Sequence, residues 1–102
     1  MKMVALALQA SLLACAIASP AAAEGKKVTI TACPYPGVEF SCLMIKDKDG
    51  IVYNITGAHP KPAPNDVAII LTGTVTDKIS ICMQGIVLDD IKWDRTKMRC
   101  PQ

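Results

Sequence analysis

The chain is short, rich in apolar residues and close to neutral, with 102 residues, 51% hydrophobic, 4% aromatic and a formal net charge of +2. A chain of this length forms one small domain, which excludes a multidomain enzyme. Eleven Lys and Arg are balanced by nine Asp and Glu, and both are scattered along the sequence. Neither a polyanion-binding surface nor an acidic tail is indicated, so charge points to no particular partner.

Residues 1–23 have the organisation of a secretory signal peptide. Lys2 precedes an apolar, alanine-rich stretch, and the small residues Ala21 and Ala23 provide a signal peptidase site. The stretch is too short and too rich in alanine for a membrane span. We therefore expect cleavage after Ala23, a mature domain over residues 24–102 and a periplasmic or secreted protein.

The five cysteines also bear on where the protein resides and how its leader is processed. Cys15 follows Leu12-Leu13-Ala14, so an alternative interpretation of the leader is a lipobox, in which Cys15 carries a lipid anchor. The other four cysteines are an even number in an exported chain, and we expect two disulfides. They have no C-x-x-C spacing and are accompanied by a single histidine, so no metal site is predicted. These four are Cys33, Cys42, Cys82 and Cys100.

The first half of the expected domain alternates between apolar and polar residues with period two, which is typical of half-buried strands. Residues 27–32 form the first predicted strand, and residues 34–37, with two prolines and a glycine, interrupt it. Residues 38–45 form the second strand. Asp49-Gly50 then predicts a hairpin turn into a third strand over residues 51–56.

The second half begins with a proline-rich connection over residues 57–66, which is too rich in proline for a helix or a central strand. Residues 67–76 are the longest predicted strand, with a bend at Gly73. Residues 79–83 continue the sheet, and a last strand runs from residue 86 to residue 93.

The polar end from Asp94 to Gln102 has no periodicity, and residues 24–102 contain no apolar pattern with helical spacing. Five or six short strands joined by tight turns predict a closed or nearly closed all-β domain.

Three groups of residues in the centre of the chain share a pattern with a known family. They are Gly37-Val38-Glu39 with Cys42, Asp49-Gly50-Ile51-Val52-Tyr53 with Gly57, and Ile79-Ser80-Ile81-Cys82-Met83-Gln84-Gly85. In these residues the chain resembles small exported bacterial domains of unassigned function with an OB-fold-like barrel. The resemblance implies a small five- to six-stranded OB-like barrel over residues 24–102, and it implies no particular activity. Pro64-Asn65-Asp66 departs from the Gly-Asp turn that is usual in these domains.

Spacing alone leaves three pairings of the four cysteines open. In a five-stranded barrel the first and last segments lie near each other, so we expect one bridge between Cys33 and Cys100. The other then joins Cys42 and Cys82. Chain-entropy arithmetic gives each bridge at most about 4 kcal/mol of stabilisation.

Residues suited to chemistry are sparse. The single histidine, His59, lies in the proline-rich connection, and no nucleophile turn surrounds any serine, so we expect no enzyme, no catalytic residue and no cofactor. The four aromatic residues fall on different segments without interleaved arginines, so we expect no nucleic-acid ligand. Trp93, Tyr35 and His59 remain the candidate binding residues.

These observations predict a non-catalytic exported binding module whose ligand, a protein, a glycan or a small molecule, is unknown. The alternative is an envelope inhibitor of a hydrolase of the protease or lysozyme type. Such an inhibitor would insert the loop from Pro60 to Pro64 into the cleft of an enzyme.

Overall fold

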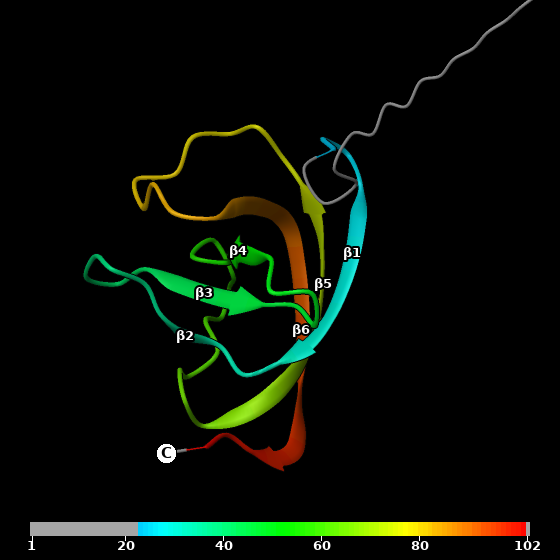
Figure 1. The fold of residues 1–102 in the computed structure, drawn as a ribbon, viewed down its shortest axis with the longest axis vertical. Helices are drawn as coiled ribbons and strands as arrows, with labels where there is room; N and C mark the ends of the chain where they lie inside the picture. Colours follow the sequence, from blue (N-terminus) through cyan, green and yellow to red (C-terminus); the bar gives the residue numbers. More distant parts are fainter. Residues whose placement is uncertain (1–22, 102) are drawn as a thin grey trace, which may run out of the picture.

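The computed structural model describes residues 23–101, and in this range the chain forms six β-strands and no helix (Figure 1). The all-β prediction is confirmed. The expected leader and Cys15 fall within residues 1–22, outside the described residues. The strands are β1 (Lys27–Ala32), β2 (Tyr35–Pro36), β3 (Leu43–Lys46), β4 (Val52–Asn54), β5 (Val67–Val75) and β6 (Ile86–Arg99).

The strands form one sheet in the order β1-β5-β6-β4-β3-β2, in which only β4 and β6 are parallel neighbours. The sheet is not closed into a barrel, contrary to the expectation. Its two edges, β1 and β2, are separated in sequence by only Cys33 and Pro34. Pro34 has no backbone donor, and the strands on its two sides pair with different neighbours, β1 with β5 and β2 with β3. Because one stretch of chain supplies both edges, the sheet curls around its core.

Periodicity located β1 and β5 well. β1 has the predicted bounds, and β5 ends one residue before the predicted end. The pairing of β5 with β6 is irregular between Thr72 and Thr74, but the extra residue lies on β6, so the bend expected at Gly73 stays a prediction. The Asp49-Gly50 turn is confirmed between β3 and β4, where the Asp47 side chain accepts hydrogen bonds from the N–H groups of Asp49 and Ile51. β4 is shorter than the predicted strand over residues 51–56.

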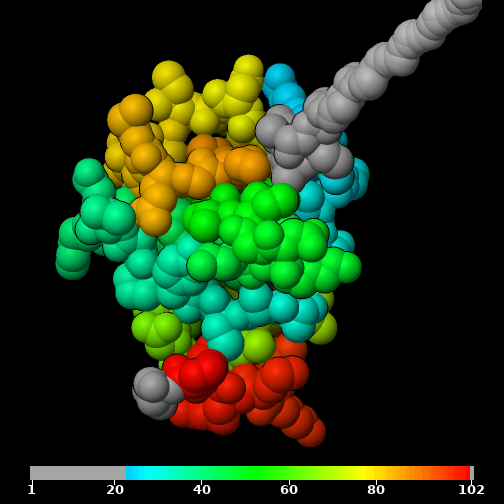
Figure 2. Space-filling model, viewed as in Figure 1, coloured from blue at the N-terminus to red at the C-terminus, as the bar shows by residue number. Residues whose placement is uncertain are grey.

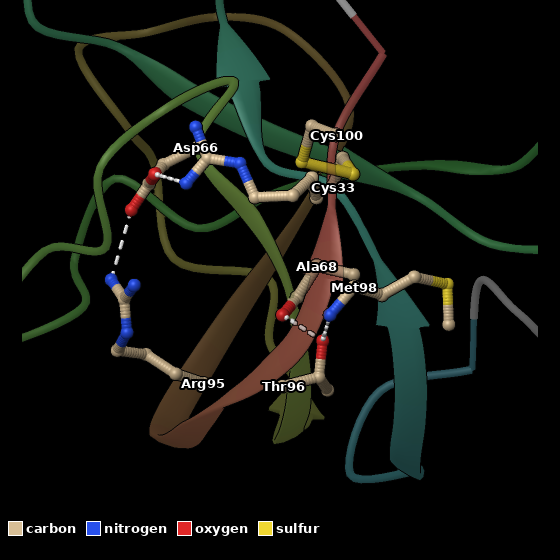
Figure 3. A network of polar contacts seen from close by, with 8 residues as sticks. Cys33, Asp66, Ala68, Arg95, Thr96, Met98 and Cys100 are labelled. Carbon is tan, nitrogen blue, oxygen red and sulfur yellow. Dashed lines mark hydrogen bonds and ion pairs between the residues drawn. A yellow bond between two sulfur atoms is a disulfide. The ribbon is translucent and has the colours of Figure 1, made fainter.

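The polar end of the chain, expected to be irregular, continues β6 as far as Arg99. Polar contacts, rather than apolar packing, stabilise this part of β6. Thr96 Oγ1 donates to the Ala68 carbonyl at 2.7 Å, while Arg95 and Arg99 both pair with Asp66, at 2.9 and 3.3 Å (Figure 3). Apolar periodicity cannot detect a strand that is held in this way.

The disulfide prediction is confirmed for both bridges. The Cα atoms are 5.9 Å apart in Cys33–Cys100 and 5.8 Å apart in Cys42–Cys82. The first bridge ties the end of β1 to the end of β6, beside the start of β5. No helix in residues 23–101 has the length and apolarity that a membrane span requires.

The core has two parts. The larger cluster lies between the two halves of the curled sheet, and the smaller one contains the Cys42–Cys82 bridge and Met44, with Tyr35 and Val52 packed against it. The second cluster therefore lies where β3 meets the chain between β5 and β6. The larger cluster consists of Ile30, Leu43, Ile45, Tyr53, Ile55, Ile69, Leu71, Val75 and Leu88.

We expect the double substitution Cys33→Ala/Cys100→Ala to lower the free energy of unfolding by about 2–4 kcal/mol, because the bridge constrains the unfolded chain over a long loop. Urea denaturation of the non-reduced protein measures the change. Met98→Ser, an exposed substitution on the same strand, is the control, and it should change the stability by less than about 0.5 kcal/mol. Equal stabilities for the two variants would contradict this prediction.

Candidate binding site on two loops joined by a disulfide

Two loops carry large apolar side chains that lie almost wholly in solvent. One loop covers residues 37–42, between β2 and β3, and the other covers residues 76–85, between β5 and β6. Isolated exposed apolar residues are normal, but a group of them on adjacent segments marks an interaction surface. The exposed fraction is 87% for Val38, 97% for Phe40, 92% for Ile79, 88% for Ile81 and 88% for Met83. We call this surface the apolar loop face.

The two loops are fixed to each other. The Cys42–Cys82 disulfide joins them, and the Gln84 side-chain carbonyl accepts a hydrogen bond from the Val38 N–H at 2.9 Å. Gly37 is packed too closely for a side chain, since a Cβ at this position would lie 2.9 Å from the Cys42 Cβ. Figure 2 shows the turquoise and the yellow-to-orange loops as neighbours on one side of the molecule. The two loops that carry the five apolar side chains therefore lie side by side.

A buried asparagine holds the longer loop against the sheet. Asn54, on β4, is 2% exposed, and its Nδ2 donates to the Cys82 carbonyl at 2.7 Å and to Ser80 Oγ at 3.1 Å. Ser80 Oγ also accepts from the Cys82 N–H at 3.0 Å. Ser80 and Cys82 thus face the body of the protein, and Ile79 and Ile81 face away from it.

The predicted strand over residues 79–83 is wrong, although its alternation is present. The segment is an irregular loop whose polar and cysteine positions bond to the body, and whose large apolar positions point into solvent. Burial of the apolar face, which a strand prediction assumes, does not occur. The disulfide at Cys82 is a signal that the sequence does contain, because a bonded cysteine points inward. Alternate residues then point outward, and these are Ile79, Ile81 and Met83.

The predicted strand over residues 38–45 begins only at Leu43, because a turn occupies its first part. The Gly37 N–H donates to the Cys42 carbonyl at 2.8 Å, and the Cys42 N–H donates to the Glu39 carbonyl at 3.1 Å. Ser41 has a φ of 70°, in the left-handed region. The turn leaves Phe40 in solvent.

A groove of about 440 Å³ lies between this turn and the proline-rich connection. Phe40 lines one side, and Lys61, Pro62 and Pro64 line the other. Lys61 Nζ donates to the Ser41 carbonyl at 3.1 Å, which ties the two walls together. The groove therefore extends the apolar loop face towards the connection.

The two loops carry few charges, two acidic and one basic. Residues 37–42 contain Glu39, and residues 76–85 contain Asp77 and Lys78, while Lys61 lies at the groove. Lys78 Nζ lies 2.7 Å from Asp89 Oδ2 on β6. This hydrogen bond raises the pKa of Lys78 and lowers the pKa of Asp89. The pair secures the root of the longer loop.

The residues that the sequence suggested for binding do not form one site. His59 and Trp93 both line a second groove, separate from the one beside Phe40. Trp93 Nε1 already donates to the Pro60 carbonyl at 2.7 Å. Tyr35 is half-buried against the smaller core cluster, with Lys46 Nζ 6.0 Å from its ring centre. None of the three belongs to the apolar loop face, whose residues the sequence analysis missed.

In residues 23–101, no three His, Cys, Asp or Glu side chains gather as the ligands of a metal ion would. Comparisons of the chain with known protein families, with curated proteins and with solved structures find no match. The interpretation of the apolar loop face therefore rests on its own geometry.

We expect Asn54→Ala to lower the free energy of unfolding by about 1–3 kcal/mol, because it removes the buried amide that bonds to the Cys82 carbonyl and to Ser80 Oγ. The Cys82 carbonyl then keeps only the Gln84 N–H as a donor. Amide hydrogen exchange in residues 79–83 should also become faster. Ser80→Ala keeps the bond between Asn54 and Cys82 and should cost less. A loss of stability in Asn54→Ala that does not exceed that of Ser80→Ala would show that this anchor is unimportant.

Proposed function

We propose that the protein is a non-catalytic exported binding module that holds its ligand on the apolar loop face. The observation that carries the proposal is the exposure of five large apolar side chains on two loops that a disulfide joins. Apolar surface of this kind is costly to keep in water, since it promotes non-specific association. Its rigid attachment to the sheet supports a role in recognition.

The order of the strands supports an OB-like arrangement for this module. β1 and β2 can be taken as two halves of one first strand, so that β3, β4, β5 and β6 follow as the second to fifth strands. OB domains are five-stranded and partly open, and they bind ligands on the second and third strands and on the loops after the first and fourth strands. The loops in those two positions here are residues 37–42 and 76–85.

Two features support an exported location. Disulfides persist in oxidising compartments, and the domain has two of them. Residues 1–23 have the composition of a secretory leader.

The alternative function, inhibition of an envelope hydrolase, would use the loop from Pro60 to Pro64. That loop packs against the body, because Pro62 is buried and the Pro60 carbonyl accepts from Trp93. An inhibitory loop must reach into an enzyme cleft. These contacts favour the apolar loop face as the binding surface.

The proposal predicts that substitutions on the apolar loop face weaken binding without lowering the stability of the protein. Phe40→Ser and Ile81→Ser should leave the free energy of unfolding within about 0.5 kcal/mol of the original value, because both side chains are exposed. Both should reduce retention of the protein by the envelope fraction of its own cells, and both should reduce fluorescence of the apolar dye anilinonaphthalene sulfonate.

Met98→Ser is the matched control, because Met98 is also exposed but lies on β6, outside the two loops (Figure 3). It should retain binding. If the loop variants bind the envelope fraction as well as Met98→Ser does, the apolar loop face is not the binding site.

A further inference from the structure

We propose that the apolar loop face docks on the surface of a phospholipid bilayer with zwitterionic headgroups and inserts its protruding side chains among the upper parts of the acyl chains. This inference rests on the proposed function and names the partner of that same site. Three properties of the face support it: the shape of the exposed surface, its charge balance and the fixation of its backbone.

The shape favours a fluid partner. Each of the five side chains is at least 87% exposed, so each protrudes separately and little of it packs against its neighbours. A folded protein partner would need a rigid pocket for each protrusion, because protein interiors and interface cores are close-packed. Lipid chains are fluid and fill the space around protruding side chains without a matching surface.

The charges favour zwitterionic lipid. Glu39 and Asp77 are accompanied by only two cations, Lys61 and Lys78, and Lys78 is already paired with Asp89. The face therefore has no excess of positive charge. Binding to anionic membranes typically uses clusters of several Lys or Arg, and these loops have no such cluster. Insertion of apolar side chains is therefore the main attraction, and it requires neither anionic lipid nor low salt.

The fixed backbone sets the depth of insertion. The disulfide, Asn54 and Gln84 hold the inner sides of the loops, so docking does not require the loops to become ordered. Irregular backbone cannot enter hydrocarbon, because its polar groups would lose their hydrogen bonds to water. Glu39, between Val38 and Phe40, must also stay at the level of the headgroups. The side chains alone therefore reach the acyl chains, as in shallow interfacial binding.

Flotation with phosphatidylcholine vesicles tests the proposal. The full chain is expressed, and the protein is used after whatever processing of its N-terminus the expression host carries out. All variants then have the same N-terminus. The unaltered protein should float with the vesicles. Phe40→Ser and Ile81→Ser should each lower the partition coefficient by about tenfold or more, because each removes a large inserted side chain. Met98→Ser should bind as the unaltered protein does.

Glu39→Gln tests for a variant that binds vesicles more tightly than the unaltered protein. Loss of this charge should increase binding to phosphatidylcholine vesicles, because a neutral amide can approach the acyl chains at lower cost. Added anionic lipid and high salt should change the binding of the unaltered protein by less than about twofold. In Phe40→Trp, the fluorescence of the new indole should shift to shorter wavelength on addition of vesicles, and brominated lipid should quench it.

Several results would overturn the proposal. One is the absence of flotation, and another is flotation that Phe40→Ser and Ile81→Ser do not weaken. A third is a concentration-dependent dimer without vesicles, seen by light scattering and lost in Phe40→Ser, which would identify a second copy of the chain as the occupant. In these cases the proposed function still stands if the loop variants lose retention by the envelope fraction, and it fails with the inference if they do not.

Discussion

The Cys42–Cys82 crosslink is the constraint on which the candidate site depends. It is buried with Met44 in a small cluster of its own, apart from the main core, and it joins two loops that lie outside the strands. A domain of this size buries too little apolar surface to order such loops by packing alone. The covalent bond supplies the order instead, and the hydrogen bonds from Asn54 and to Gln84 follow from the position that it fixes.

The elements that the sequence predicts well are those held by apolar burial. β1 and β5 alternate cleanly because each has one buried face, and their bounds follow from that alternation. The disulfide pairing was also correct, because the neighbourhood of the first and last segments survives even though the sheet is open. Closure depends on backbone pairing between the two edge strands, β1 and β2, and side-chain periodicity contains no information about it.

The elements that the sequence misses are held by other interactions. The end of β6 depends on Thr96, Arg95 and Arg99, whose partners lie far away in sequence. The turn at residues 38–41 follows from a left-handed Ser41 rather than from a turn-forming glycine. In both places the hydrophobic pattern is either absent or reversed, so methods based on it predict the wrong element. The sequence points to Trp93 and His59 as binding residues by their chemistry, whereas the structure distinguishes residues by exposure.

The reversed pattern of residues 79–83 also explains how a small protein can keep an apolar surface without collapse of that surface onto its core. Collapse would require Ile79, Ile81 and Met83 to turn inward, but other residues take the inward positions. Ser80 bonds to Asn54 on β4, and Cys82 and Gln84 bond to the other loop. Rotation of the loop would break these contacts and leave Asn54 Nδ2 buried without an acceptor, at a cost of about 1–3 kcal/mol. The polar and covalent contacts on one side of the loop therefore maintain the exposure of the apolar side chains on the other. Because the main core takes no part in this arrangement, the apolar side chains of the face can vary with the ligand while the fold stays the same.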